Sequence, residues 1–335
     1  MTQNIPQSTA PAEAAGILTG RRPRFAKPPS WRSVAILIPF IVLFVALSIG
    51  SGPFLNPDNL LNILDQQSAT LIIAAAGTLV LISGGIDLSV GATYALAGVV
   101  SAQVALAHGV VVAIIVTLGV GIVVGLANGV ISTLFRINSL IATLAMSFVV
   151  SGIGSSVSGG NLIVLTNQPS FAAIAQTSFL DVRTSVWIAL VVVVVLALLL
   201  ARTTNGRYLY AAGGNAEASR LAGIRVHGVR ILAFTLSGVA ASLGGIIDTS
   251  RVLSAQSSSG TSLTFTVLAG IVVGGTSILG GEGAIWRTVV GVLFIALVGN
   301  GFDLLGINAL YQQIALGVIL LLAVGIDAWS RVLRR

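Results

Sequence analysis

Long blocks of apolar residues without a charged side chain recur along the chain from about residue 31 to its end. About ten of these blocks reach roughly 20 residues, the length that an α-helix needs to cross the hydrocarbon core of a bilayer. Hydrophobic residues make up 55% of the chain, more than a soluble core would hold. The pattern therefore predicts an all-α, polytopic integral membrane protein with about ten transmembrane helices. Their expected centres are Phe40, Ala74, Ala97, Val120, Ser147, Val193, Val239, Val272, Phe294 and Val318.

Residues 1–30 form a polar segment without the apolar core of a signal peptide. Pro, Ala, Ser, Thr and Gln dominate its first part, a composition that cannot bury enough apolar surface to fold. We therefore expect a disordered basic cytoplasmic tail at 1–30 and a transmembrane domain at 31–335, which contains a cytoplasmic loop at 202–230. The basic residues of the tail are Arg21, Arg22, Arg24 and Lys27.

The distribution of positive charge predicts the orientation, because cytoplasmic loops of membrane proteins carry an excess of Lys and Arg. With the N-terminus in the cytoplasm and ten spans, only Arg183 and Arg251 of the 17 Lys and Arg residues lie outside. Both termini are therefore expected in the cytoplasm. Since the arginines flank apolar blocks, the formal net charge of +7 indicates contact with membrane lipid and no binding to nucleic acid.

A faint internal repeat relates the two halves of the chain. Asn128-Gly129 ends the fourth block, and Asn300-Gly301 ends the ninth. Each pair is followed by an Ile-Asn dipeptide and a new span. The two copies lie five spans apart, so they point in opposite directions, as inverted repeats of transporters do. Two short matches in a glycine-rich chain could also arise by chance.

The composition excludes several kinds of chemistry. The chain has no cysteine, and its single lysine, Lys27, is not in a phosphate-binding loop, so any ATP hydrolysis needs another chain. The two histidines, His108 and His227, are expected on opposite sides of the membrane. We therefore predict no catalytic residue, no metal site and no bound cofactor. No predicted span carries an ionisable residue in its interior, which argues against an ion-coupled carrier.

The loop at 202–230 is the longest polar break between the apolar blocks, and it carries five arginines. It predicts a short helix that starts at Ala216, with Asn215 as its N-cap and Gly223 as its C-terminal stop. Gly213 and Gly214 are expected to adopt backbone angles closed to other residues. So short a helix is not stable alone, so the rest of the chain or another protein must hold it. Its apolar face contains Ala218, Leu221 and Ala222, and Glu217 suits its first turn.

Two glycine-rich motifs are expected to break helices at the cytoplasmic side, and a tight interhelical turn is the simpler explanation of each. Polar side chains on the spans either line a path for an uncharged solute or join helices by hydrogen bonds. The first motif contains Gly84, Gly85, Asp87 and Ser89, and the second contains Gly274, Gly275 and Glu282. The candidates for the path are Gln66, Gln103, Asn128, Asn300 and Gln312, with Gln67 and Gln313 beside them.

Five stretches stand out: ISGGIDLSVGATYALAGVV (82–100), GLANGVISTLFRINSLIATLAM (125–146), GRYLYAAGGNAEASRLAGIRV (206–226), LSGVAASLGGII (236–247) and GIVVGGTSILGGEGAIWRTVVG (270–291). Together and in this order they resemble the permease subunits of bacterial ATP-binding-cassette (ABC) importers for monosaccharides, the ribose, xylose, arabinose and galactose group. The resemblance runs from about residue 56 to the end. The N-terminal tail is longer than is expected for this family.

The resemblance implies a permease subunit in the bacterial plasma (inner) membrane that is not an enzyme. It also implies three partners: a separate ABC ATPase that hydrolyses ATP, a second permease copy in a homodimer, and a periplasmic or lipid-anchored sugar-binding protein. In that family a cytoplasmic helix of the central loop docks into the ATPase. The residues to which the resemblance gives this coupling role are Gly213, Gly214, Asn215, Glu217, Ala218, Leu221, Ala222 and Gly223.

We therefore expect the chain to form the translocation path for a monosaccharide, a pentose or a hexose. Two other functions stay open at this point. One is a permease of the same architecture for a branched-chain amino acid, a nucleoside or a signalling furanose. The other is a self-sufficient secondary carrier, which would show gradient-driven uptake by this chain alone.

The orientation can be tested with reporter fusions. A reporter fused after Gly159 and one fused after Asn215 should lie on opposite sides of the membrane, with the second in the cytoplasm, because this placement satisfies the positive-inside rule. Alkaline phosphatase and green fluorescent protein fusions measure the two locations. Both reporters on one side would contradict the ten-span arrangement.

Overall fold

The computed structural model describes residues 36–308 and 310–332, so the predicted tail at 1–30 lies outside the described residues. The described part consists of helices and four strands of two residues each. The helices are α2 (Leu37–Gly50), α3 (Pro57–Ile82), α4 (Val90–His108), α5 (Val110–Thr133), α6 (Ser139–Ser158), α7 (Pro169–Gln176), α8 (Thr184–Arg202), α9 (Thr204–Gly214), α10 (Ala216–Leu221), α11 (Val226–Val252), α12 (Thr261–Val273), α13 (Ile285–Leu304) and α14 (Leu310–Val332). The strands are β1 (Ile163–Val164), β2 (Ser178–Phe179), β3 (Val182–Arg183) and β4 (Ser254–Ala255), paired β1 with β4 and β2 with β3, both antiparallel.

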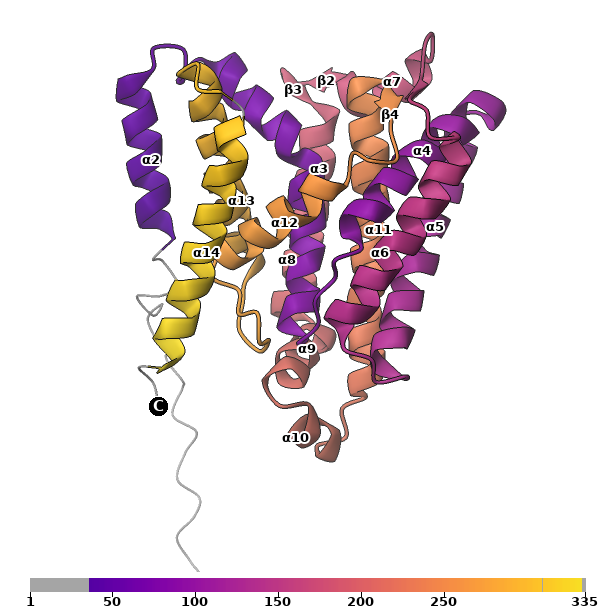
Figure 1. The fold of residues 1–335 in the computed structure, drawn as a ribbon, viewed down its shortest axis with the longest axis vertical. Helices are drawn as coiled ribbons and strands as arrows, with labels where there is room; N and C mark the ends of the chain where they lie inside the picture. Colours follow the sequence, from indigo (N-terminus) through magenta and orange to yellow (C-terminus); the bar gives the residue numbers. More distant parts are fainter. Residues whose placement is uncertain (1–35, 309, 333–335) are drawn as a thin grey trace, which may run out of the picture.

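Each of the ten predicted apolar blocks forms a helix, which confirms the all-α, polytopic class (Figure 1). Seven of these helices, α3, α4, α5, α6, α8, α11 and α13, are long and apolar enough to cross a membrane. The other apolar helices found are shorter: α2, α12 and, within α14, the stretch Leu310–Gly325.

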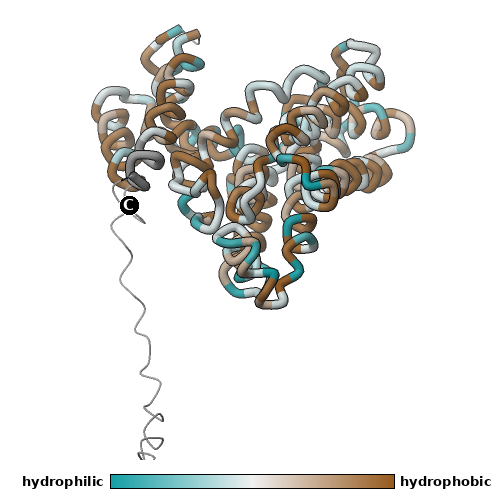
Figure 2. Tube along the Cα trace, turned by 60° about the horizontal axis from the view of Figure 1, so that its bottom comes forward, coloured by the Kyte–Doolittle hydropathy of each residue, from teal (hydrophilic) through white to brown (hydrophobic). Residues whose placement is uncertain are grey.

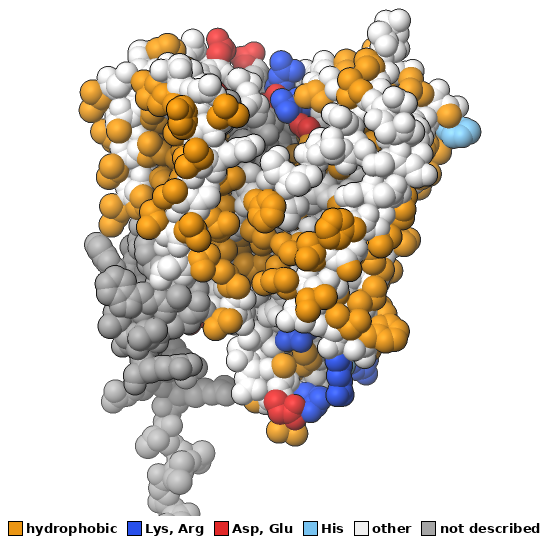
Figure 3. Space-filling model, in the orientation of Figure 1, with side chains coloured by type: hydrophobic (Ala, Val, Ile, Leu, Met, Phe, Trp, Pro, Cys, Tyr) orange, Lys and Arg blue, Asp and Glu red, His pale blue; other side chains and the backbone are white. Residues whose placement is uncertain are grey.

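The helices are arranged as an inner group and an outer group. Most of α3, α4 and α11 is buried inside the chain, and α11 packs against α3, α4 and α5. The helices α5, α6 and α8 bury far less and expose many Val, Leu and Ile side chains. Figure 3 shows apolar side chains across the middle of one face, with charged residues gathered at the two ends. This distribution matches a protein whose middle lies in lipid.

Glycine allows α5 to approach α11 closely. Gly121, Gly125 and Gly129 recur every four residues, so they lie on one face of α5. A Cβ atom on Gly125 would lie 2.5 Å from the carbonyl oxygen of Phe234, and one on Gly238 of α11 would lie 2.2 Å from that of Gly121. Membrane helices use such small residues because lipid provides no hydrophobic drive for their association.

Two of the apolar helices, α4 and α12, begin after irregular segments, and their first turns meet inside the molecule. The segment 83–89 precedes α4, and the segment 253–260 precedes α12. The backbone amide of Gly91 donates to Oγ1 of Thr264 at 3.1 Å, and a Cβ atom on Gly260 would lie 1.8 Å from the carbonyl oxygen of Gly91. The long helices before them, α3 and α11, have 26 and 27 residues. These similarities five spans apart agree with the predicted inverted repeat.

The molecule has two chemically distinct ends. One end, the α10 end, carries α9 and α10, which project below the bundle and include hydrophilic segments (Figures 1 and 2). The opposite end carries the loop at 159–183, for which the sequence left open a re-entrant segment or a lid. This loop forms α7 and three strands, and the hydroxyl of Ser250 in α11 donates to the carbonyl oxygen of Phe171 at 2.6 Å. The loop is therefore fastened to α11.

The close contact between the glycine face of α5 and α11 can be tested with two matched variants. Gly125→Val should lower the free energy of unfolding by about 1–3 kcal/mol, because a larger side chain overpacks the contact with α11. Gly119→Val, on the same helix, should stay within about 0.5 kcal/mol of the wild type, since no atom lies within 4 Å of a Cβ there. Thermal unfolding of the two purified variants in detergent measures the difference. Equal loss in both variants would contradict the close α5–α11 contact.

Candidate functional site

The central loop forms two helices, α9 and α10, and its short helix has the predicted boundaries. The side chain of Asn215 caps α10 by accepting a hydrogen bond from the backbone amide of Ala218 at 2.9 Å. Gly223 follows the helix with a φ of 83°, the left-handed conformation expected of a C-terminal stop. The expectation for Gly213 and Gly214 was wrong, because both lie in α9 without a positive φ.

The apolar face of α10 has no cover within the described part of the chain. Ala218 and Ala222 are exposed, and Leu221 is 81% exposed. Glu217 and Arg220 form an exposed ion pair at 2.6 Å, which contributes little to stability in water. The described part of the chain thus leaves the apolar face of this six-residue helix open, and such a face is suited to a contact with another protein.

The helix α9 connects α10 firmly to the bundle. Gly206, Leu209 and Ala212 are buried, and the last two belong to a core cluster with residues of α3, α8 and α11. The hydroxyl of Tyr210 donates to the carbonyl oxygen of Gly283 at 2.8 Å. Burial raises the pKa of the Tyr210 phenol above its usual value, so the hydroxyl keeps its proton for this bond.

Glycines from three separate segments meet at the end of α9, and we call this contact the glycine junction: Gly84, Gly213, Gly214, Gly280 and Gly281. A Cβ atom on Gly213 would lie 1.8 Å from the carbonyl oxygen of Ile82, so only glycine fits there. That same oxygen accepts a hydrogen bond from the amide of Gly281 at 2.9 Å. A Cβ atom on Gly280 would lie 2.8 Å from Cα of Gly84. Both helix-break motifs therefore contact the end of the helix that leads to α10.

The first motif places an acidic residue inside the bundle. Oδ1 of Asp87 accepts hydrogen bonds from the amide and the hydroxyl of Ser89, at 3.0 Å and 2.7 Å. Oδ2 accepts one from the hydroxyl of Ser237 at 2.8 Å. Since Ser237 lies well within α11, the sequence-based placement of Asp87 at the end of a span needs correction. Asn128 donates to the hydroxyl of Ser89 at 2.7 Å, so it joins α5 to this segment.

Close contacts also shape both glycine turns. Gly85 faces the ring of Phe234, and a Cβ atom on Gly274 would lie 2.5 Å from the carbonyl oxygen of Arg287. Gly275 has a φ of 80°, and the carbonyl oxygen of Glu282 accepts a hydrogen bond from the amide of Ser277 at 2.9 Å. The two motifs are thus tight turns, as the simpler explanation had it, and they are also parts of one junction.

A groove of about 510 Å³ opens toward the opposite end, between α3, α12, α13 and α14. Three of the five residues predicted for the path, Gln66, Asn300 and Gln312, line it together. Gln103 does not line it and instead donates to the carbonyl oxygen of Val157 at 2.6 Å. The sequence could not group these residues, because their helices meet only in the tertiary structure.

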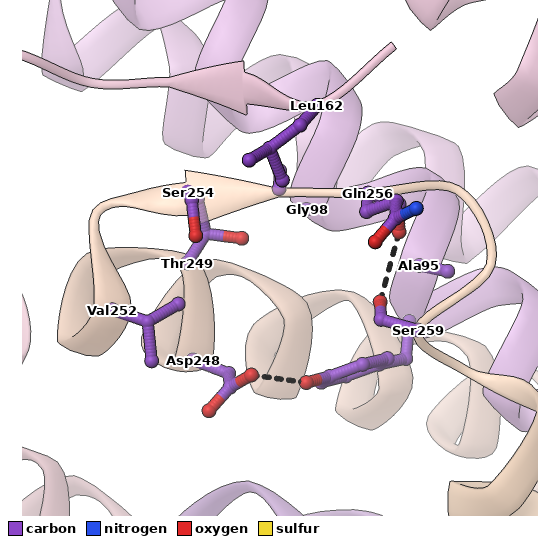
Figure 4. Close-up of a pocket in the computed structure, with 11 residues that line it drawn as sticks. Ala95, Gly98, Leu162, Asp248, Thr249, Val252, Ser254, Gln256 and Ser259 are labelled. Atoms are coloured by element: carbon purple, nitrogen blue, oxygen red, sulfur yellow. Dashed lines mark hydrogen bonds between the residues drawn. The ribbon is translucent and has the colours of Figure 1, made fainter. Parts of the chain in front are cut away.

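A smaller pocket of about 150 Å³ lies between α4, α11 and the segment 253–260 (Figure 4). The hydroxyl of Tyr94 donates to Asp248, which also accepts from the guanidinium of Arg251 at 2.7 Å and 3.1 Å. The sequence analysis did not single out Tyr94 or Asp248. Since these groups satisfy one another, they act as a link between α4 and α11.

The described residues contain no group of His, Asp or Glu that could hold a metal ion.

Comparison with known proteins identifies relatives along most of the chain. The protein family described as "Branched-chain amino acid transport system / permease component" matches residues 59–324. The ribose import permease of Escherichia coli (strain K12) is 39% identical over 295 residues, which cover 87% of this chain and 92% of that protein. The L-arabinose ABC transporter permease of Azospirillum brasilense is 37% identical over 336 residues, 98% of this chain and 97% of that protein. No solved structure matches the chain significantly.

These matches extend over the long helices, the glycine junction and α10, and they agree with the resemblance seen in the motifs. The chain therefore belongs to the family of ABC transporter permeases that includes the ribose and L-arabinose permeases of these bacteria.

Proposed function

We propose that this chain is the permease subunit of an ABC importer that carries a monosaccharide across the bacterial inner membrane. The observation that carries the proposal is the uncovered apolar face of α10 at one end of a membrane-spanning bundle. The names of the relatives, a ribose import permease and an L-arabinose permease, support a sugar as the solute. The α10 end would then lie in the cytoplasm, as would both termini.

Under this proposal, α10 is the helix that docks into a separate ATPase. Ala218, Leu221 and Ala222 supply the apolar contact, and Asn215 and Gly223 set the ends of the helix. Glu217 lies beside this face and Gly214 lies before it. A second permease copy and a periplasmic or lipid-anchored sugar-binding protein would complete the transporter.

The glycine junction gives the docking helix a direct mechanical connection to the transport domain. Gly213 contacts the backbone of Ile82, just before the segment that leads into α4. Gly281 contacts Gly214, and it lies in the loop that follows α12. Displacement of α10 by the ATPase would therefore act on α4 and α12, the two helices that begin inside the molecule. Such discontinuous helices form the path in many transporters.

The groove at the opposite end is proposed as the outer part of the path, with Gln66, Asn300 and Gln312 on its wall. Asp303 is the one charged residue that lines it among the described residues. An amino acid would bring a carboxylate, for which the described wall offers no cationic side chain, whereas a sugar brings only hydroxyl groups. The groove therefore favours the sugar over a branched-chain amino acid.

A secondary carrier is the competing function, and the buried Asp87 is the observation that bears on it. Asp87 is 5% exposed as a residue, its carboxylate is held by Ser89 and Ser237, and it does not line the groove. It is therefore poorly placed to bind a coupling ion on the solute path. Sugar accumulation driven by a proton or sodium gradient in proteoliposomes that contain this chain alone would support the carrier instead.

The docking role of α10 can be tested with Ala218→Trp. Bulk on the small face should overpack the contact with the ATPase at a cost of about 1–3 kcal/mol, which weakens association about 5- to 100-fold. Recovery of the tagged ATPase with the purified permease measures the association, and the thermal unfolding of the permease alone should not change. Ala107→Trp, the same change at an exposed position of the opposite end, is the control. Unchanged recovery of the ATPase with the Ala218→Trp permease would contradict the docking role of α10.

The adjacent glycines at the end of α9 provide a second, sharper comparison. Gly213→Ala should reduce sugar uptake by the complete transporter at least about 10-fold, because its methyl group would collide with the carbonyl oxygen of Ile82. Gly214→Ala should transport normally, since no atom lies within 4 Å of a Cβ there. Uptake into proteoliposomes and ATPase activity are measured together. If both variants behave alike, the junction does not transmit the movement of α10.

A further inference from the structure

The carboxamide side chains of the groove fall into two groups that differ in their hydrogen bonds. Asn59 and Asn300 bond to each other twice, at 2.9 Å and 3.2 Å, and so join α3 to α13. Gln312 donates to Asp303 at 2.8 Å. These amides act as interhelical contacts, which is the usual role of Asn and Gln in membrane helices.

The second group has no such partners. Asn62, Gln66 and Gln67 of α3 and Gln313 of α14 line the same groove, and none of them makes a side-chain hydrogen bond to another described residue. Asn62, Gln66 and Gln313 are exposed and Gln67 is half-buried. Each carboxamide offers two donors and one acceptor oxygen. Four amides therefore present unused donors and acceptors to one space.

We propose that Asn62, Gln66, Gln67 and Gln313 form a low-affinity subsite for an uncharged, hydroxyl-rich solute. Every hydroxyl group of such a solute both donates and accepts, so it pairs with either end of a carboxamide. These four side chains would contact the sugar along the proposed path, so the subsite rests on the proposed function.

The size and chemistry of the groove fit this class of solute. Its volume of about 510 Å³ lies within the range of small-molecule sites, about 300–1,000 Å³. The described wall contains no aromatic side chain on which a sugar ring could stack, and it has one acidic residue, Asp303, already bonded to Gln312. Neutral hydrogen bonds that exchange with water contribute little net affinity. The solute would therefore bind weakly and leave readily, as passage requires.

The alternative occupant of the groove is lipid, and the amides argue against it. A carboxamide transferred from water to hydrocarbon without a partner is strongly disfavoured. Four unpaired carboxamides on one wall would be unstable against acyl chains, whereas water or a hydroxyl-rich solute satisfies them. The groove is therefore expected to contain water when the solute is absent.

The chain has no cysteine, so single cysteines can report on the groove directly. Gln66→Cys and Gln313→Cys should react with a charged methanethiosulfonate reagent in the complete transporter, held in nanodiscs with its ATPase. Val123→Cys, on the outer surface of α5 where the side chain is 67% exposed, should not react, because lipid covers it. D-ribose, L-arabinose and D-galactose at tens of millimolar are the probes, with choline as the charged control. At least one sugar should slow both reactions about twofold or more, and choline should have no effect.

Transport measures the contribution of the same side chains. Gln66→Leu and Gln313→Leu should each lower sugar uptake about 2- to 10-fold at subsaturating sugar, the loss expected for one neutral hydrogen bond, with unchanged thermal unfolding. Asn300→Leu should instead lower the unfolding temperature, because it breaks the pair with Asn59.

The outcomes separate the subsite from the proposed function. Protection of both cysteines by a sugar, together with reduced uptake in the leucine variants, supports the subsite. Unreactive cysteines, absence of protection by all three sugars, or normal uptake in both leucine variants would overturn it. If the wild-type transporter with its ATPase imports none of the sugars, the proposed function fails, and the cysteine reactions still report whether the groove is a water-filled site for hydroxyl-rich solutes.

Discussion

Close contact between backbones at glycine is the interaction on which the rest of this structure depends. Apolar side chains gain little by leaving lipid for another apolar surface, so helices in a membrane must gain dispersion energy from tight packing. Gly125 lets α5 reach α11, Gly260 lets the starts of α12 and α4 meet, and Gly213 brings α9 against Ile82. The same device thus builds the bundle and fastens the helix pair α9–α10 to it.

The two ends of the molecule have different roles in the proposed function. At the α10 end, the apolar face of α10 is suited to bind a partner protein, and the glycine junction is suited to transmit a movement of that helix to the bundle. At the opposite end, a groove with unpaired carboxamides suits weak contact with a neutral solute. The helices α4 and α12 begin between these ends, so a movement at the junction would act close to the proposed path. Selectivity can then reside in a separate binding protein, and the permease needs only to let the solute pass.

Much of the fold follows from local properties of the sequence. The ten apolar blocks predicted ten helices, because the length and hydropathy of a span are readable without knowing its neighbours. The ends of α10 were equally local, since Asn215 caps the helix with its own side chain and Gly223 adopts a positive φ within its own turn. The membrane class, the number of apolar helices and the two ends of α10 were therefore determined by the sequence by itself.

Contacts between distant segments were decided only by the tertiary structure. The requirement for glycine at Gly213 comes from a carbonyl oxygen of α3, and its own backbone angles are those of an ordinary helix. Asp87 lies inside the bundle because the segment 83–89 turns back to meet α11. Gln66 lines the groove and Asn128 does not, although both are amides on apolar spans. The physical reason is common to all three: a sequence specifies the faces of each helix, but which faces meet depends on how all the helices pack together.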